Sequence, residues 1–75
     1  MRIKDLLGMQ VLDIDAKNIG KVDDLDFDEK SGQINKVAVS LKKNILTSDE
    51  VLVHFDNIKS IGDYVLLKIK INKDE

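Results

Sequence analysis

The chain has 75 residues, a formal net charge of −2 at pH 7 and no cysteine. That length allows a single domain, close to the lower limit at which a chain folds without help. The lack of cysteine excludes disulfides and thiolate metal sites, so oligomerisation is an available way to add stability. The 12 basic and 14 acidic residues are interspersed, whereas a nucleic-acid-binding surface needs a basic stripe, so we expect no nucleic-acid partner.

No apolar run approaches the roughly 20 residues that a transmembrane helix requires. The N-terminal segment 1–8 is charged at its start but lacks the long apolar run and the small-residue cleavage site of a signal peptide. We therefore expect a cytoplasmic protein without a membrane span.

The first element in chain order is a helical turn at residues 5–8, which a glycine ends. Its two leucines, Leu6 and Leu7, are expected to close one end of the core. Residues 9–14 follow as a strand on which neither face is purely polar. Such mixed strands suit small barrels, in which strands curl from one packing environment into another.

A long strand predicted over residues 19–28 is the centre of the fold. Turn-forming residues precede it at 15–18 and follow it at 29–32. Strands at 9–14 and 34–41 flank those turns, so the three strands are predicted to form a meander of two hairpins.

Two β-bulges are predicted between the second and third strands. A regular ladder that starts from the turn would place Leu25 opposite a lysine. An extra residue near 35–36 and another near 23–24 restore apolar pairing, and such bulges also bend a sheet. The alternative is a regular ladder whose strands are buried on both faces at their ends. The pairs that the bulges predict are Phe27 with Ile34, Leu25 with Val37, and Val22 with Val39.

The least patterned segment, residues 42–50, predicts a loop because it is rich in Lys, Asn, Thr and Ser. Alternation over residues 51–55 then predicts a fourth strand, with Leu52 and His54 on the face opposite to the core. A short 3₁₀ turn is expected at residues 56–58.

The last predicted element is a hairpin of strands 58–61 and 64–71. The dipeptide Gly62-Asp63 between them is a typical two-residue hairpin connection. Residues 72–75 form a polar C-terminal tail, so the expected domain spans residues 1–71.

Four short motifs occur in order between residues 6 and 66. They are Leu6-Leu7-Gly8-x-x-Val11, Ile19-Gly20-Lys21-Val22-x-Asp24, Gly32-x-Ile34 and Val53-x-Phe55-x-x-Ile58-x-x-Ile61-Gly62-Asp63-x-Val65-Leu66. Together they resemble the PRC-barrel domain, the family named for the H subunit of the photosynthetic reaction centre. The resemblance implies an all-β fold: a small, strongly bent antiparallel β-barrel of five to six strands with no long helix.

The resemblance also implies a function, that of a non-catalytic adaptor that binds other proteins. Small stand-alone members are common in archaea and some are linked to cell division, so the same role is implied here. Another branch forms part of a ribosome maturation factor, which makes an RNA- or ribosome-associated adaptor the alternative. The chain departs from the family at Ala16, where Gly is frequent, and at His54, where Pro is frequent. Without that proline, the strand that contains His54 is expected to pair more fully.

No metal site is expected. Segment 13–24 opens like a calcium loop, but Lys17 stands at the third ligand position and Asp24 replaces the bidentate Glu at the twelfth. Asp24, Asp26 and Asp28 alternate onto one strand face, where a hard cation could gather. We interpret them instead as a solvated acidic stripe that keeps an outer face from aggregating.

No catalytic residue and no cofactor are expected, so the protein is predicted not to be an enzyme. His54 is the only histidine, and without a cysteine partner it makes neither a zinc site nor a nucleophile. We expect it to face solvent or a neighbouring carboxylate. No serine lies in a nucleophile elbow, and no glycine-rich phosphate loop is present. Two of the three aromatic residues, Phe27, Phe55 and Tyr64, are expected in the core.

A protein interface is the remaining candidate site. Tyr64 and Leu66 have the parity opposite to the expected core residues of the last strand, and Leu52 has the same position on the fourth strand. These three residues are predicted to mediate self-association, with a homodimer as the expected partner arrangement. The alternative is that they cover a second side of the barrel against Leu6 and Leu7.

Overall fold

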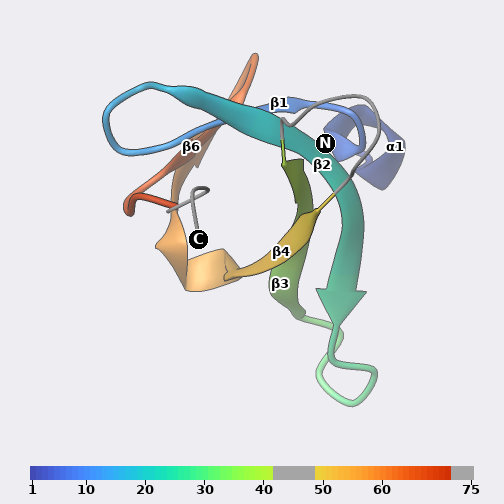
Figure 1. Ribbon diagram of the computed structural model, residues 1–75. Helices are drawn as coiled ribbons and strands as arrows, with labels where there is room; N and C mark the ends of the chain where they lie inside the picture. The colour runs from blue at the N-terminus through green and yellow to red at the C-terminus, as the bar shows by residue number, and fades with distance from the viewer. Residues whose placement is uncertain (42–48, 72–75) are drawn as a thin grey trace.

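The structure is a computed structural model that describes residues 1–41 and 49–71. Within those residues a single six-stranded sheet curls around the core, accompanied by one short helix and one 3₁₀ turn (Figure 1). The elements are α1 (Ile3–Leu6), β1 (Gln10–Leu12), β2 (Asn18–Phe27), β3 (Ile34–Leu41), β4 (Glu50–His54), η1 (Phe55–Asn57), β5 (Ile58–Ile61) and β6 (Val65–Leu67). The predicted all-β fold without a long helix is confirmed for this part of the chain.

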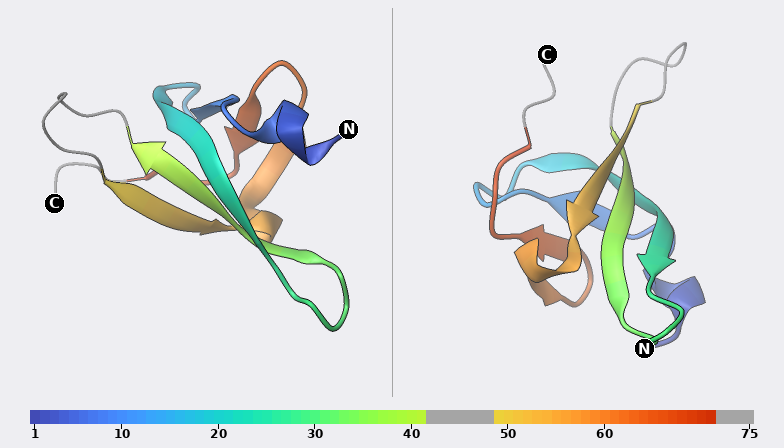
Figure 2. Two further views of the ribbon diagram at one scale, coloured as in Figure 1. Left: turned by 90° about the vertical axis from the view of Figure 1, so that its right-hand side faces the viewer. Right: turned by 90° about the horizontal axis from the view of Figure 1, so that it is seen from below.

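The strand order in the sheet is β4-β3-β2-β1-β6-β5. All neighbouring strands are antiparallel except β1 and β6, which run parallel, so the purely antiparallel sheet that was predicted is wrong at this pair. The sheet is strongly bent (Figure 2), but β4 and β5 remain its two edges and do not pair with each other. The described strands therefore do not close into the predicted barrel, because η1 turns the chain away from β4 before β5 begins.

The β1–β2–β3 meander and both of its predicted bulges are confirmed. Phe27 pairs with Ile34, and the ladder shifts register there because Asn35 is an extra residue on β3. A second shift makes Asp23 the extra residue on β2. These two insertions keep apolar residues on the inner face of both strands, as the pairs Leu25 with Val37 and Val22 with Val39 show.

The core lies on the concave face of the sheet and is formed mainly by β-branched residues, which fit a pleated surface. Its buried members are Leu6, Val11, Ile19, Val22, Val37, Val39, Val53, Val65 and Leu67. Leu6 enters this cluster, but Leu7 is 42% exposed, so only one of the two leucines closes the core. The reason is that α1 is a single turn: Gly8 donates its N–H to the Val22 carbonyl, which leads the chain straight into the sheet.

The aromatic residues are placed differently from the prediction. Phe55 packs against the core, whereas Phe27 is 59% exposed and Tyr64 is 43% exposed. Phe27 is the last residue of β2, where the β2–β3 hairpin projects beyond the rest of the molecule (Figure 2). One aromatic residue among these three, not two, belongs to the core.

The end of the chain leaves the sheet earlier than predicted. β6 ends at Leu67, after which Lys68 donates its N–H to the Asn57 carbonyl and the Ile69 carbonyl accepts the N–H of Ile14. Ile61 pairs with Val65, so three residues, not two, connect β5 to β6. Most of the predicted loop at residues 42–50 and the whole tail at residues 72–75 lie outside the described residues.

β2 and β3 lie close together at Gly20. A Cβ atom on this residue would overlap the carbonyl oxygen of Ser40 and come within 2.9 Å of its carbonyl carbon. Glycine is therefore required here by the contact between two strands.

Candidate functional site

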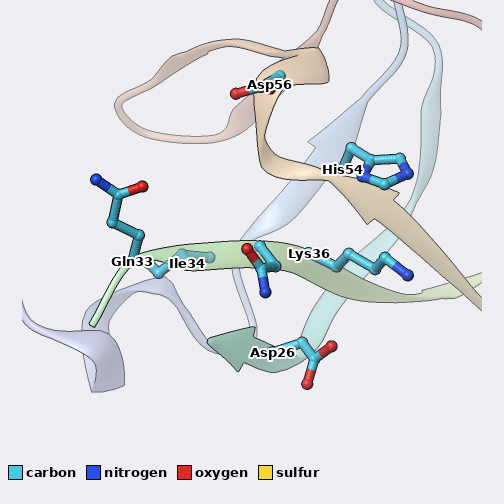
Figure 3. A pocket seen from close by; sticks show the side chains of 7 residues that line it. Asp26, Gln33, Ile34, Lys36, His54 and Asp56 are labelled. Carbon is cyan, nitrogen blue, oxygen red and sulfur yellow. The ribbon is translucent and has the colours of Figure 1, made fainter. Parts of the chain in front are cut away.

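A polar pocket of about 310 Å³ lies beside the bulge at the start of β3 (Figure 3). Its lining comes from the end of β2, the start of β3, the end of β4 and η1: Asp26, Gln33, Ile34, Asn35, Lys36, His54 and Asp56. In Figure 3 the side chains of Lys36 and His54 extend in one direction, while Gln33 and Asp56 extend elsewhere. The labelled polar groups do not converge on one point in this view.

His54 and its neighbours form a row across three strands. Lys36 pairs with His54 on β4 and with Asp26 on β2, so all three side chains share one face of the sheet. This is the outer face, because the adjacent row of Leu25, Val37 and Val53 faces the core. His54 is exposed, as the sequence predicted.

The other end of β4 is acidic. The pKa of Glu50 is raised above its usual value, first by a hydrogen bond shared with the Asp23 side chain and further by desolvation and by the negative charges of Asp23 and Asp24. The bulge brings Asp23 to this position, which strand parity alone does not indicate. The outer face of β2–β3–β4 thus carries carboxylates at the Glu50 end and the Lys36–His54 pair at the other.

The predicted acidic stripe is only partly formed. Asp24 and Asp26 are exposed on β2, but Asp28 belongs to the following turn, where its Oδ1 accepts the N–H of Lys30 at 2.9 Å. Over residues 1–41 and 49–71, no group of three or more His, Cys, Asp or Glu side chains could hold a metal ion.

The segment that resembled a calcium loop is a tight turn between β1 and β2. Asp13 is 2% exposed, and its Oδ1 accepts the N–H groups of Asp15 at 2.9 Å and of Lys17 at 3.0 Å. A buried carboxylate that is hydrogen-bonded in this way stabilises the turn. Ala16 within it has φ +64°, a conformation that glycine adopts more readily, so Ala16 is strained where the family often has Gly.

The three predicted interface residues lie on separate parts of the sheet. Leu52 is 54% exposed on β4, Tyr64 lies in the β5–β6 connection, and Leu66 is half-buried on β6 between β1 and β5. Three strands separate β4 from β6 in the sheet order, so Leu52 and Leu66 are not neighbours through the sheet. The largest exposure of the three belongs to Leu52.

Sequence reasoning missed two features of this surface. One is the proximity of Asp23 to Glu50, which follows from combining the predicted bulge with the pairing of β3 and β4. The other is the exposed apolar side of the N-terminal turn, where Met1 is 76% and Ile3 58% exposed. Neither shows a periodic signal in the sequence.

Comparison with protein families decides the relationship that the motifs suggested. The family model of the PRC-barrel domain matches residues 1–71. This chain belongs to the PRC-barrel domain family. A comparison with curated protein sequences found no match. None of the helices in the described part of this PRC-barrel domain is long and apolar enough to cross a membrane.

Solved structures of other proteins share the fold of this PRC-barrel domain. One of them is a 16S ribosomal RNA processing protein, RimM, from Pseudomonas aeruginosa, with a TM-score of 0.66 and 18% sequence identity. The match covers 89% of this chain and 42% of that chain. At this identity the likeness concerns the fold, and the domain spans less than half the length of the RimM chain.

Proposed function

We propose that this PRC-barrel domain is a non-catalytic protein-interaction module that self-associates as a dimer. The observation that carries the proposal is Leu52, a large apolar side chain that is 54% exposed in the middle of an edge strand. Exposed apolar side chains on a sheet edge favour association with another chain.

Self-association suits the energetics of so small a domain. A chain of this length buries only about 60% of the surface that it exposes when unfolded, so an interface adds stability that the core alone lacks. Tyr64 and Leu66 stay predicted interface residues, but they lie at the β5–β6 side of the sheet and do not belong to the surface around Leu52. A cytoplasmic location and a role in cell division belong to the same proposal and rest on the resemblance to archaeal members.

Sedimentation velocity tests this function. We expect the wild type to form dimers at micromolar concentration and Leu52→Lys to be a folded monomer, because lysine places a charge in the apolar contact. Ile14→Lys is the matched control, since Ile14 is 57% exposed in the β1–β2 turn, away from the proposed surface. A wild type that stays monomeric at millimolar concentration would contradict the proposal. Leu66→Lys tests whether Leu66 belongs to the interface or to the core. If this variant unfolds, Leu66 belongs to the core.

A ribosome-associated adaptor is the second candidate, and the fold shared with RimM favours it. The acidic residues around Glu50 and the net charge of −2 argue for contact with a ribosomal protein instead of RNA. Co-sedimentation with purified small ribosomal subunits tests this candidate. Binding that persists at high salt supports a protein contact, whereas absence of the domain from the ribosomal pellet at low salt overturns it.

A further inference from the structure

We infer that the dimer forms by antiparallel pairing of β4 with β4 of a second copy, with Leu52 on the twofold axis. The inference rests on the self-association proposed above and names its surface, its register and the backbone groups that form it. It joins two six-stranded sheets edge to edge into one continuous sheet.

The direction of the backbone amides on β4 follows from its pairing with β3. Leu41 donates its N–H to the Asp49 carbonyl at 2.7 Å, and the ladder continues without a register shift to Lys36 and His54. In an antiparallel ladder hydrogen-bonded pairs alternate with pairs that are not hydrogen-bonded. Val51 and Val53 therefore point their amides at β3. The amides of Glu50, Leu52 and His54 point away from it, toward the free edge.

That free edge lacks a partner strand among the described residues. β4 ends the strand order, and no backbone hydrogen bond in this part of the chain joins its outward N–H groups to another segment. Figure 2 shows β4 as the border of the β2–β3–β4 layer. Unpaired edge amides on a regular strand are a template for another strand.

A register centred on Leu52 gives every residue of β4 a partner in the second copy. It pairs each of the five residues of the strand, from Glu50 opposite His54 of the partner subunit to Leu52 opposite Leu52 of the partner subunit. The outward amides of both copies then fall on hydrogen-bonded pairs. On the inner face, Val51 meets Val53 of the partner subunit, so the apolar row of each core continues across the axis.

Electrostatic repulsion also favours the register centred on Leu52 over one centred on Glu50. Glu50 lies beside Asp23 and Asp24, so a register centred on Glu50 would bring two acidic clusters together. The register centred on Leu52 instead places Glu50 beside the His54–Lys36 pair of the other copy. Asp26 and Asp56 also lie near that pair, but Asp26 is one strand farther from the axis than Lys36 and Asp56 lies in η1. The carboxylate of Glu50 therefore lies opposite His54 of the partner subunit and not opposite another carboxylate.

Proline at position 54 tests the pairing without disturbing the fold. His54 has φ −60°, which the proline ring also imposes, and its N–H points away from β3. The ring in His54→Pro removes an outward donor and blocks the approaching strand at both ends of the symmetric junction. His54→Ala is the matched control, because it removes the imidazole but keeps the N–H.

Sedimentation velocity over a concentration series, with circular dichroism as the folding check, decides the inference. We expect His54→Pro to raise the dimer dissociation constant by ~100-fold or more, as loss of symmetric hydrogen bonds and a steric block predict, and to keep a wild-type spectrum. His54→Ala should change it by less than ~10-fold. A His54→Pro variant that is folded and dimerises like the wild type overturns the edge pairing but leaves self-association standing. A monomeric wild type overturns both.

If His54→Pro does not fold, a second variant carries the test. Leu52→Thr introduces a β-branched strand former and keeps the outward N–H, so it should still dimerise through the backbone. Full loss of the dimer in Leu52→Thr would show that the contact is made by side chains, which overturns pairing of the two edges.

Discussion

The two edges of the sheet, β4 and β5, differ in length, regularity and charge. β4 has five residues and pairs with β3 without a register shift, whereas β5 has four and shifts register at Lys59. Natural proteins protect edge strands from pairing by making them short, bulged and lysine-bearing. β5 has all three features, while β4 presents Leu52 on a regular strand. The difference indicates that β5 is closed to strand pairing and that β4 is open to it.

The largest effect is expected where the contact between β2 and β3, the strand that pairs with β4, is disrupted. Gly20→Ala forces a Cβ into the Ser40 carbonyl and should lower the free energy of unfolding by about 3 kcal/mol, a large share of the stability of a small domain. Urea denaturation measures it. Gly62→Ala is the matched control, because nothing lies within 4 Å of the Cβ it adds, and it should change stability by less than about 1 kcal/mol. Equal effects of the two variants would disprove the close approach of β2 and β3.

A smaller change in stability, a gain and not a loss, is expected in the turn between β1 and β2. Ile14 of this turn donates its N–H to the Ile69 carbonyl in the segment after β6. Ala16→Gly relieves φ +64° and should stabilise the fold by ~0.5–1 kcal/mol, raising the melting temperature by a few degrees without changing dimerisation. Gly32→Ala is the reverse change at φ +78° in open space and should destabilise. If Ala16→Gly lowers the melting temperature, the strain assigned to Ala16 is wrong.

The smallest effect concerns the acidic end of β4 and is a dependence on pH. Because the pKa of Glu50 is raised above 4.5 by Asp23 and Asp24, the folded chain keeps this proton in a pH range where the unfolded chain has released it. The stability that this group contributes is therefore present below pH 4.5 and is lost as pH rises through the raised pKa. Thermal melts from acidic to neutral pH should show a flatter profile for Glu50→Gln than for the wild type. Parallel profiles would contradict the interaction with Asp23, and Glu29→Gln, in the β2–β3 turn, is the control.

The parts of the fold that sequence predicted are those between consecutive strands. The bulges at Asp23 and Asn35 were predictable because two strands joined by a short turn must match their apolar residues. The parallel pairing of β1 with β6 was not, since it joins segments about fifty residues apart and depends on how η1 directs the chain. Phe27 was misplaced for a related reason: its alternation fits a core residue, but the hairpin extends past the core.

For the candidate site, sequence identified single residues but not their arrangement. The exposure of Leu52 and His54 followed from strand alternation and is confirmed. Whether Leu52, Tyr64 and Leu66 form an interface stays a prediction, and the sheet order separates Leu52 from Leu66. That order depends on long-range pairing, which alternation within a strand does not encode.

Amide hydrogen exchange along β4 tests the open edge most directly. The amides of Val51 and Val53 point to β3 and should be protected at every protein concentration. The amides of Leu52 and His54 should exchange fast in dilute monomer and become protected as the dimer forms. Concentration-dependent protection of these two amides is the result that edge pairing predicts. Fast exchange of the Leu52 amide in a fully dimeric sample would contradict it.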